Sequence, residues 1–439
     1  MALDKRGWFF IIKPSGQSFK GESKMKKTYK FQKGFTLITT LTFLITSLVV
    51  FAGGDAPAEQ GFKVKPVLQV VSQTSVGIAW ESHNSSVGEV KISLSQNMSN
   101  PQILTTSNKK NHKVSVTGLT ANTRYYYTVS ADTETTGVAS FLTALNKGDR
   151  SPFRFAVYGD TRKAHWAEDI FAAYGDNDDH LPVLQSMMSY SPDFLVHVGD
   201  FVYSGNDMGD IYNFFDVEKD LLAQHPLLPT YGNHEFKGGN TTAHTLMDSY
   251  LIPAPGSGGD FSYYSYDYGN VHILVLNTGY GVRANDNYDV ITAGSAQNNF
   301  ALQDLQAASA DPDIDHIFVS MHNPLYSVAG FGDNTQLQNA LEGMFKTYGV
   351  KAVFMGHEHD YQHQVKDGIH YILSGGGGSP ILDAAWYGDE NDSEADLIKY
   401  DDVLNYVIVD INGSTVSVES RKVQGNGNST SSVIESFSL

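Results

Sequence analysis

The feature that most constrains this chain is a series of short apolar runs that end abruptly in polar, glycine-containing motifs. Helix-length segments such as Phe300–Ala310 and Gln336–Tyr348 lie between these runs. Buried strands that alternate with helices are typical of α/β domains, whose reactive groups lie just beyond the carboxyl ends of the strands. We therefore expect an α/β layered domain over residues 150–439, whose last strands close a sheet. The runs are Phe153–Tyr158, Phe194–Val198, Val271–Leu276, His316–Met321 and Ala352–Met355.

Residues 63–145 have a different pattern, with period-two alternation and frequent turn residues. Val76, Ile78 and Trp80 alternate, and so do other triplets along the segment. About seven short strands around one core Trp indicate an all-β sandwich. The segment 119–125 resembles the end loop of fibronectin type III domains, in which a Tyr forms a corner. Trp80 is then a core residue and not a ligand platform.

Five of the motifs place hard-metal ligands at strand ends. Each motif alone is weak, because a lone strand-end Asp is more often a cap or turn former. Together they supply carboxylate, amide and imidazole groups with no sulfur, which suits divalent or trivalent metals of intermediate hardness. Their glycines let the backbone turn sharply. His357 and His359 would share one face in extended geometry. The motifs are Gly159-Asp160, Gly199-Asp200-Phe201-Val202-Tyr203, Gly232-Asn233-His234-Glu235, Met321-His322 and Gly356-His357-Glu358-His359.

In order and spacing these motifs resemble the metallophosphoesterase superfamily, and within it the purple acid phosphatases. The discriminating residue is Tyr203, because serine/threonine phosphoprotein phosphatases have Asp-Arg-Gly in that segment. The resemblance covers roughly residues 63–375, and the fibronectin-like segment is similar to that of the family's larger members. It implies a β-sheet sandwich flanked by helices, preceded by the all-β domain.

The resemblance also implies a role for each motif residue. Asp200 would bridge two metal ions, and His234 would contact the phosphate or assist the leaving group. Fe(3+) would occupy the first site and Zn(2+), Mn(2+) or Fe(2+) the second, and a metal-bound hydroxide would attack phosphorus. Besides Asp200, the first site would use Asp160, Tyr203 and His359, and the second would use Asn233, His322 and His357.

Three positions depart from the family pattern or stay open. The stretch 323–332 contains no His, although plant members carry adjacent histidines there, so the leaving-group acid and the pH optimum are not assigned. Arg162 is either a phosphate contact or a surface residue. His363 stands where the family usually has Arg. His197 lies inside a strand and is expected to be packed and hydrogen-bonded.

Composition excludes several classes of chemistry. The chain has no cysteine, which rules out disulfides, thiolate metal sites and cysteine nucleophiles. Its net charge is −18, although the first 52 residues are basic. The acidic remainder argues against a nucleic-acid partner, because phosphate backbones need a basic surface. A small phosphate ester would need a local positive field, which bound metals supply.

The N-terminus has the organisation of a secretory signal. A basic stretch at 26–33 precedes an apolar run from Phe35 to Ala52, and Gly-Gly-Asp follows. We expect residues 1–52 to be an N-terminal extension and signal peptide, 53–62 a linker, and the mature protein to be exported (periplasmic or extracellular) without stable membrane association. Two alternatives remain: an uncleaved membrane anchor, since 18 residues just reach spanning length, and a type IV prepilin site, although Thr39 stands where that pattern has Glu.

The sequence therefore predicts a dinuclear-metal phosphatase that hydrolyses phosphate monoesters. A phosphodiesterase or nucleotidase on the same site is the alternative within enzymes. An inactive secreted binding protein is the alternative from another class, and the complete ligand set argues against it. No motif indicates the oligomeric state.

Overall fold

The structure is a computed structural model that describes residues 59–163, 172–174, 179–237, 249–252, 263–278, 291–382 and 392–439. The predicted signal segment 1–52 and most of the linker lie outside these residues. Within the described part, no helix is long and apolar enough to cross a membrane.

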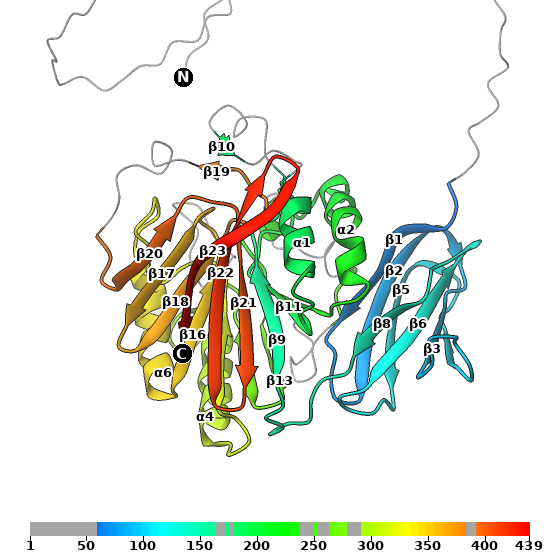
Figure 1. The fold of residues 1–439 in the computed structure, drawn as a ribbon, viewed down its shortest axis with the longest axis horizontal. Helices are drawn as coiled ribbons and strands as arrows, with labels where there is room; N and C mark the ends of the chain where they lie inside the picture. The colour runs from blue at the N-terminus through cyan, green and yellow to red at the C-terminus, as the bar shows by residue number, and fades with distance from the viewer. Residues whose placement is uncertain are drawn as a thin grey trace, which may run out of the picture. The chain divides into compact units, whose positions relative to one another are not determined.

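The N-terminal part is the predicted β-sandwich (Figure 1). Trp80 is 1% exposed and stacks on His112 with ring centroids 4.8 Å apart, so its core role is confirmed. The Tyr125 hydroxyl accepts a hydrogen bond from the Thr120 N–H (3.0 Å), which forms the expected corner. The strands are β1 (Phe62–Gln69), β2 (Ser75–Ser86), β3 (Glu89–Ser93), β4 (Gln102–Thr105), β5 (Lys109–Thr117), β6 (Arg124–Ala131), β7 (Glu134–Thr135) and β8 (Ala139–Leu142).

Two sheets form the α/β part, as the apolar runs predict. In the first, β9, β11 and β12 are parallel and the C-terminal strands are antiparallel. In the second, β14, β15, β16 and β18 are parallel and its outer strands antiparallel. The first comprises β9 (Phe153–Tyr158), β11 (Phe194–His197), β12 (Leu227–Pro229), β21 (Asn405–Asn412), β22 (Thr415–Gly425) and β23 (Asn428–Ser438). The second comprises β13 (Tyr264–Tyr268), β14 (Val271–Val275), β15 (His316–Ser320), β16 (Val350–Met355), β17 (Tyr361–Lys366), β18 (Ile369–Ser374) and β20 (Asp396–Asp401).

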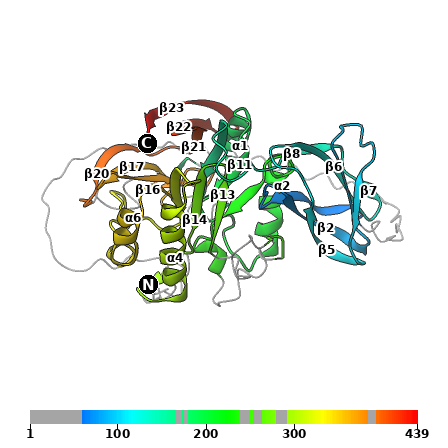
Figure 2. The ribbon, with the colours of Figure 1, turned by 90° about the horizontal axis from the view of Figure 1, so that it is seen from below.

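Helices cover the outer faces of these two sheets (Figures 1 and 2). One apolar core lies between the sheets and continues into the sandwich. A second lies under α1 and α2, and a third under α4, α5 and α6. The order is therefore helix, sheet, sheet, helix, which confirms the predicted fold class. The helices are α1 (His180–Met188), α2 (Met208–Leu222), η1 (His234–Phe236), α4 (Ala296–Ala310), α5 (Thr335–Leu337), η3 (Gln338–Glu342) and α6 (Gly343–Thr347). Two short strands, β10 (Ala172–Tyr174) and β19 (Ile381–Leu382), pair with each other in a separate sheet.

The sandwich and the α/β part share a sheet. Strand β1 pairs with β12 in parallel where Gln69 meets Leu227, so β1, β2 and β5 extend the first sheet. The Gln69 side chain also donates to the Tyr250 carbonyl (2.6 Å) and accepts from the Ile252 N–H (2.9 Å). Across the same junction, the Tyr266 hydroxyl donates to the Val71 carbonyl (2.6 Å). Because these contacts cross the predicted boundary between the two domains, the boundaries stay a prediction.

Candidate metal centre

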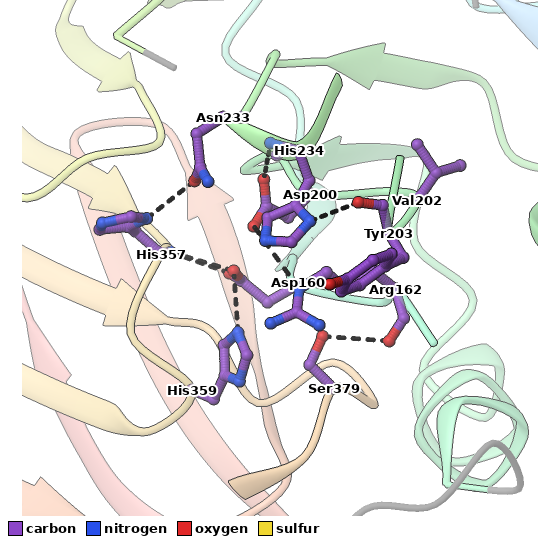
Figure 3. Close-up of polar contacts among 12 residues, drawn as sticks. Asp160, Arg162, Asp200, Val202, Tyr203, Asn233, His234, His357, His359 and Ser379 are labelled. Atoms are coloured by element: carbon purple, nitrogen blue, oxygen red, sulfur yellow. Dashed lines mark hydrogen bonds and ion pairs between the residues drawn. The ribbon is translucent and has the colours of Figure 1, made fainter. Parts of the chain in front are cut away.

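The predicted ligands come from the carboxyl ends of strands in both sheets (Figure 3). Asp160 follows β9 and Asp200 follows β11, while His322 follows β15. Ligand atoms of these three residues lie within 4.8 Å of one another, and all three side chains are buried. Parallel strands bring their ends to one edge, which is why residues 162 positions apart in the chain meet here.

Asn233, His357 and His359 complete this group. The Asn233 amide oxygen lies 3.1 Å from His322 Nε2 and 3.0 Å from His357 Nδ1. His359 Nε2 lies 3.7 Å from Asp160 Oδ1. Six of the seven predicted ligands are therefore within contact distance of another predicted ligand, although the ligand role of each stays a prediction.

Left-handed backbone aims these side chains at a common centre. Asp160, Asp200 and His357 have φ values of 56°, 58° and 77°. Such values are uncommon outside glycine and cluster at functional sites. The expectation that His357 and His359 share a face of an extended segment is wrong, because the turn at His357 brings them to the site. Gly199 has a φ of 104°, and a Cβ there would collide with the His322 ring.

Backbone carbonyls fix the tautomers of three imidazoles. Nδ1–H of His322 donates to the Val198 carbonyl (2.8 Å), and Nδ1–H of His359 donates to the Pro380 carbonyl (2.8 Å). Nδ1–H of His234 donates to the Tyr203 carbonyl (2.6 Å). In a neutral ring the Nε2 atom then carries a lone pair. Metal-ligating histidines characteristically bond their other nitrogen in this way.

These lone pairs face carboxylates instead of donors. His322 Nε2 lies 3.3 Å from Asp200 Oδ1, and His234 Nε2 lies 3.8 Å from Asp200 Oδ2. Lone pairs that face one another repel unless a proton or a cation lies between them. The donor set is oxygen and nitrogen only, which suits intermediate or hard cations. The residues therefore fit metal ions.

The electrostatics of the carboxylates also favour a cation. Burial raises the pKa of Asp160 well above its usual value, and the charge of Asp200 adds to this effect. For His322, burial lowers the pKa, but the neighbouring Asp200 and Asp160 outweigh it and raise the pKa to about 9. The site thus draws a positive charge into a buried position.

Two family models match the chain in tandem. The calcineurin-like phosphoesterase model matches residues 153–361, and the model of the purple acid phosphatase N-terminal domain matches residues 63–143. The first range spans the strand ends just described, and the second spans the β-sandwich.

The chain is a purple acid phosphatase-like metallophosphoesterase. It is 24% identical over 319 residues to purple acid phosphatase 15 of Arabidopsis thaliana, in an alignment that covers 64% of this chain and 56% of that relative. It is 27% identical over 271 residues to tartrate-resistant acid phosphatase type 5 of Homo sapiens, covering 54% and 77%. The chain thus spans little more than half of the Arabidopsis relative's length.

A solved structure has the same fold. The purple acid phosphatase PPD1 from yellow lupin (Lupinus luteus) seeds superposes with a TM-score of 0.66 over 85% of this chain and 73% of that one. The sequence identity is 18%, so the likeness concerns the fold alone. Membership of the metallophosphoesterases implies metal ions, and the buried Asp/His cluster is where they would bind.

Arg162 and Tyr203 lie beside the metallophosphoesterase centre. Arg162 is 4% exposed and its Nε lies 3.9 Å from Asp200 Oδ2, so the alternative of a surface Arg is wrong. The Tyr203 ring contacts the Arg162 guanidinium (5.5 Å to the ring centroid) and the Lys237 ammonium (3.3 Å). Burial and the charge of Arg162 lower the pKa of His234 to about 3, so its ring is neutral here.

One functional residue was missed from the sequence. The buried carboxylate of Glu235 accepts hydrogen bonds from the N–H groups of Asp200 (3.0 Å), Phe201 (2.8 Å) and Gly232 (2.7 Å). It therefore ties the Asp200 loop to the loop that carries Asn233 and His234. The sequence feature that could have identified Glu235 is its position directly after Asn233 and His234, two predicted site residues.

Two other histidines have structural surroundings. His197 is packed on Phe201 with ring centroids 3.9 Å apart, and its Nδ1 accepts from the Gly199 N–H (3.1 Å). Its Nε2–H then donates to Thr161 Oγ1 (3.0 Å), which confirms the expected hydrogen-bonded role. His363, at the position where the family has Arg, pairs with Glu435 (2.8 Å).

Proposed function

We propose that this chain is an exported phosphatase that hydrolyses phosphate monoesters with two metal ions. The observation that carries the proposal is the convergence of imidazole Nε2 atoms on the carboxylates of Asp160 and Asp200. When bound, the two ions would supply positive charge to the phosphate oxygens and lower the pKa of water at the site. The first ion would be held by Asp160, Asp200, Tyr203 and His359, and the second by Asp200, Asn233, His322 and His357.

The protein's own groups would position the ester. Arg162 offers a guanidinium that never loses its charge, and its burial beside Asp200 supports a role as a donor to a phosphate oxygen. His234 lies on the same side, since its Nε2 also faces Asp200 Oδ2. Glu235 would keep Asp200 and Asn233 in register while the substrate exchanges.

The function is tested with the mature protein, reconstituted with iron alone or with iron together with zinc or manganese. We expect two metal ions per chain by elemental analysis and hydrolysis of phosphate monoesters. Faster turnover of diesters would favour the phosphodiesterase or nucleotidase alternative. Protein that retains no metal and hydrolyses no ester would support the alternative of an inactive secreted binding protein.

Tyr203 tests the identity of the first metal. A phenolate oxygen is a hard, negative donor that suits ferric iron. Iron-loaded protein should absorb visible light through charge transfer from the phenolate, and Tyr203→Phe should lose this band while Asp200 still holds metal. The Lys237 ammonium over the ring offers the competing explanation, in which Tyr203 only packs. Stoichiometric ferric iron without a visible band in the wild type would support that explanation.

Export is tested by the mass of the mature chain. We propose cleavage after Ala52, because small residues stand at the end of the apolar run. Protein recovered outside the cytoplasm should begin near Gly53. A chain that keeps residues 35–52 and stays in the membrane would support the anchor alternative.

A further inference from the structure

A glycine tract follows strand β18 at the edge of the second sheet that carries the metal centre. It runs from Gly375 to Gly378, and Ser379 and Pro380 connect it to β19. Strand β18 is parallel to β16, so the carboxyl ends of both strands lie at this edge. All six residues, 375–380, are buried, yet none of them is a predicted ligand. The tract therefore lies where it can support the ligands without being one of them.

Hydrogen bonds join this tract to the first metal site and to the predicted phosphate contact (Figure 3). The Ser379 N–H donates to the Asp160 carbonyl (2.8 Å), and the Ser379 hydroxyl donates to the Arg162 carbonyl (3.2 Å). The Nδ1–H of His359 donates to the Pro380 carbonyl (2.8 Å). The tract thus holds two predicted ligands of the first ion together with the arginine beside them.

The second metal site is held by other parts of the chain. The Nδ1–H of His322 donates to the Val198 carbonyl, which lies at the end of β11 (2.8 Å). Among the described residues, no hydrogen bond joins positions 375–380 to Asn233, His322 or His357. The support that the tract provides is therefore directed to the first site.

The absence of side chains lets the tract lie directly against the ligand loops. A Cβ on Gly377 would collide with the Gly159 carbonyl oxygen, and a Cβ on Gly375 would collide with the Glu358 carbonyl oxygen. Both partners are backbone atoms, so neither can rotate away as a flexible side chain would. Each carbonyl belongs to the residue directly before a predicted ligand of the first ion. A side chain on either glycine would therefore displace such a ligand.

A buried amide anchors the tract to the first sheet. Asn405, at the start of β21, is 0% exposed, and its N–H donates to the Gly376 carbonyl (2.8 Å). Its Nδ2–H donates to the Asp360 carbonyl (2.9 Å), and its Oδ1 accepts from Ser374 Oγ (2.7 Å). The tract is therefore fixed to both sheets before any ion binds, and such preorganisation lowers the cost of bringing ligands together.

We propose that residues 375–380 are the positioning element of the first metal site. They hold the backbone of Asp160 and the ring of His359, and they thereby set the affinity for the first ion but not for the second. They also hold Arg162 beside the site. This inference rests on the proposed two-metal function. The tract acts through the ligands, so its members are positioning residues and not catalytic residues.

Metal binding alone tests the proposal, by calorimetric titration of the metal-free mature protein with zinc. The wild type should show two binding events, one that His359→Ala removes and one that His322→Ala removes. Gly377→Ala should weaken the first event about 10–100-fold, the usual effect of losing the support behind a metal ligand. The second event should stay within about threefold of the wild type. Gly137→Ala is the matched control, because a Cβ there would meet open space, and it should change neither event.

Two further variants extend the test. Where Gly377→Ala does not fold, Pro380→Ala takes its place, since it keeps the carbonyl that His359 uses but frees the φ angle. It should weaken the same event, by a smaller factor. Ser379→Ala loses the bond to the Arg162 carbonyl but keeps its own N–H. It should retain both zinc events and weaken the binding of inorganic phosphate to the zinc-loaded protein by roughly three- to tenfold.

Two results would overturn the proposal. One is equal weakening of both zinc events, which is what a purely structural role of the tract predicts. The other is an unchanged first event in the folded variant, Gly377→Ala or its replacement. Either result would leave the proposed hydrolysis of phosphate esters standing, because turnover by the wild type is a separate measurement. Conversely, a wild type that binds two zinc ions and shows the selective loss, but hydrolyses no ester when reconstituted, would support the positioning role and contradict the proposed function.

Discussion

The β-sandwich and the strand ends of the α/β part bury their histidines in different ways. In the sandwich, His112 stacks on Trp80 and bonds Thr106 (2.6 Å), and the Tyr125 hydroxyl satisfies a backbone N–H. At the candidate metal centre, the Nε2 atoms of His322 and His359 face the carboxylates of Asp200 and Asp160. Good packing explains the first region. The second has a cost in stability that a bound cation would offset.

The two regions are nevertheless one folded body. They share a sheet at Gln69 and Leu227 and an apolar core between the sheets. The Tyr127 hydroxyl also donates to the Ala223 carbonyl just beyond α2 (2.7 Å). Stability gained in the sandwich can therefore offset part of the cost of burying unpaired polar groups at the candidate metal centre. Mutations that separate stability from turnover test this division of roles.

Asp160→Asn should have the largest effect. Asn keeps the size and tolerates the left-handed backbone at this position, but it removes a carboxyl group whose ionisation burial disfavours. Turnover should fall by more than about 10⁴, because a lost metal removes several kcal/mol of charge stabilisation. The metal-free variant should melt at a higher temperature than metal-free wild type. Elemental analysis, kinetics and calorimetry measure the three effects, and a variant that keeps both ions and full turnover would contradict the assignment.

His234→Ala should affect turnover without affecting metal content. Its Nδ1–H is used by the Tyr203 carbonyl, and its Nε2 faces Asp200 from a greater distance than that of His322. Loss of such a positioned group typically lowers the rate by about 10²–10⁴. The measurement is kcat/KM together with metals per chain. A fall to one metal would make His234 a ligand.

The strand ends could be predicted from sequence because two signals agreed there. Apolar runs located the strands, and the polar residue after each run located the site. Asp160, Asp200 and His322 were found in this way, and the structure brings them together. The long-range contacts that hold the site residues in place could not be predicted. The carboxylate of Glu235 accepts hydrogen bonds from N–H groups more than 30 positions earlier in the chain, and no local pattern encodes such a contact.

The details of backbone and surface were also beyond the sequence. The left-handed turn at His357 comes with a hydrogen bond from its N–H to Asp160 Oδ2 (3.0 Å), a residue far away in the chain, whereas periodicity reports only local geometry. In the sequence, Val90, Ile92 and Leu94 alternate with polar residues, but β3 ends at Ser93 and Leu94 is 66% exposed. Alternation indicates which face a residue takes only while the strand continues.

Trp80→Ala should lower stability without changing the chemistry of folded molecules. The side chain is 1% exposed at the centre of the sandwich, and truncating a core aromatic residue costs about 3–5 kcal/mol. Urea unfolding and kcat per folded molecule separate the two effects. Trp80→Phe is the milder variant if the Ala protein does not fold. A folded variant with lower kcat would mean that the sandwich shapes the metal centre directly.

His272→Gln should have the smallest effect, and it sharpens the comparison within one sheet. Both nitrogens of His272 have carboxylate partners, Asp267 (2.7 Å) and Asp304 (2.8 Å), unlike those of His322. Burial lowers its pKa, but these carboxylates outweigh burial and raise it to about 9. Lys147, 3.0 Å from Asp267, is the other charge facing the pair.

The sign of the pH dependence follows from this raised pKa. The stabilisation by His272 should be complete below the unfolded value near 6.5 and lost as pH rises through about 9. Its upper limit is about 3.5 kcal/mol, at ~1.4 kcal/mol per pKa unit. Unfolding free energies at pH 6 and pH 9.5 should therefore show a gap between wild type and His272→Gln that shrinks with pH. In His225, burial lowers the pKa, so the cost of His225→Gln should instead shrink toward acid. A pH-independent gap for His272 would mean that its pKa is the same in the folded and the unfolded protein.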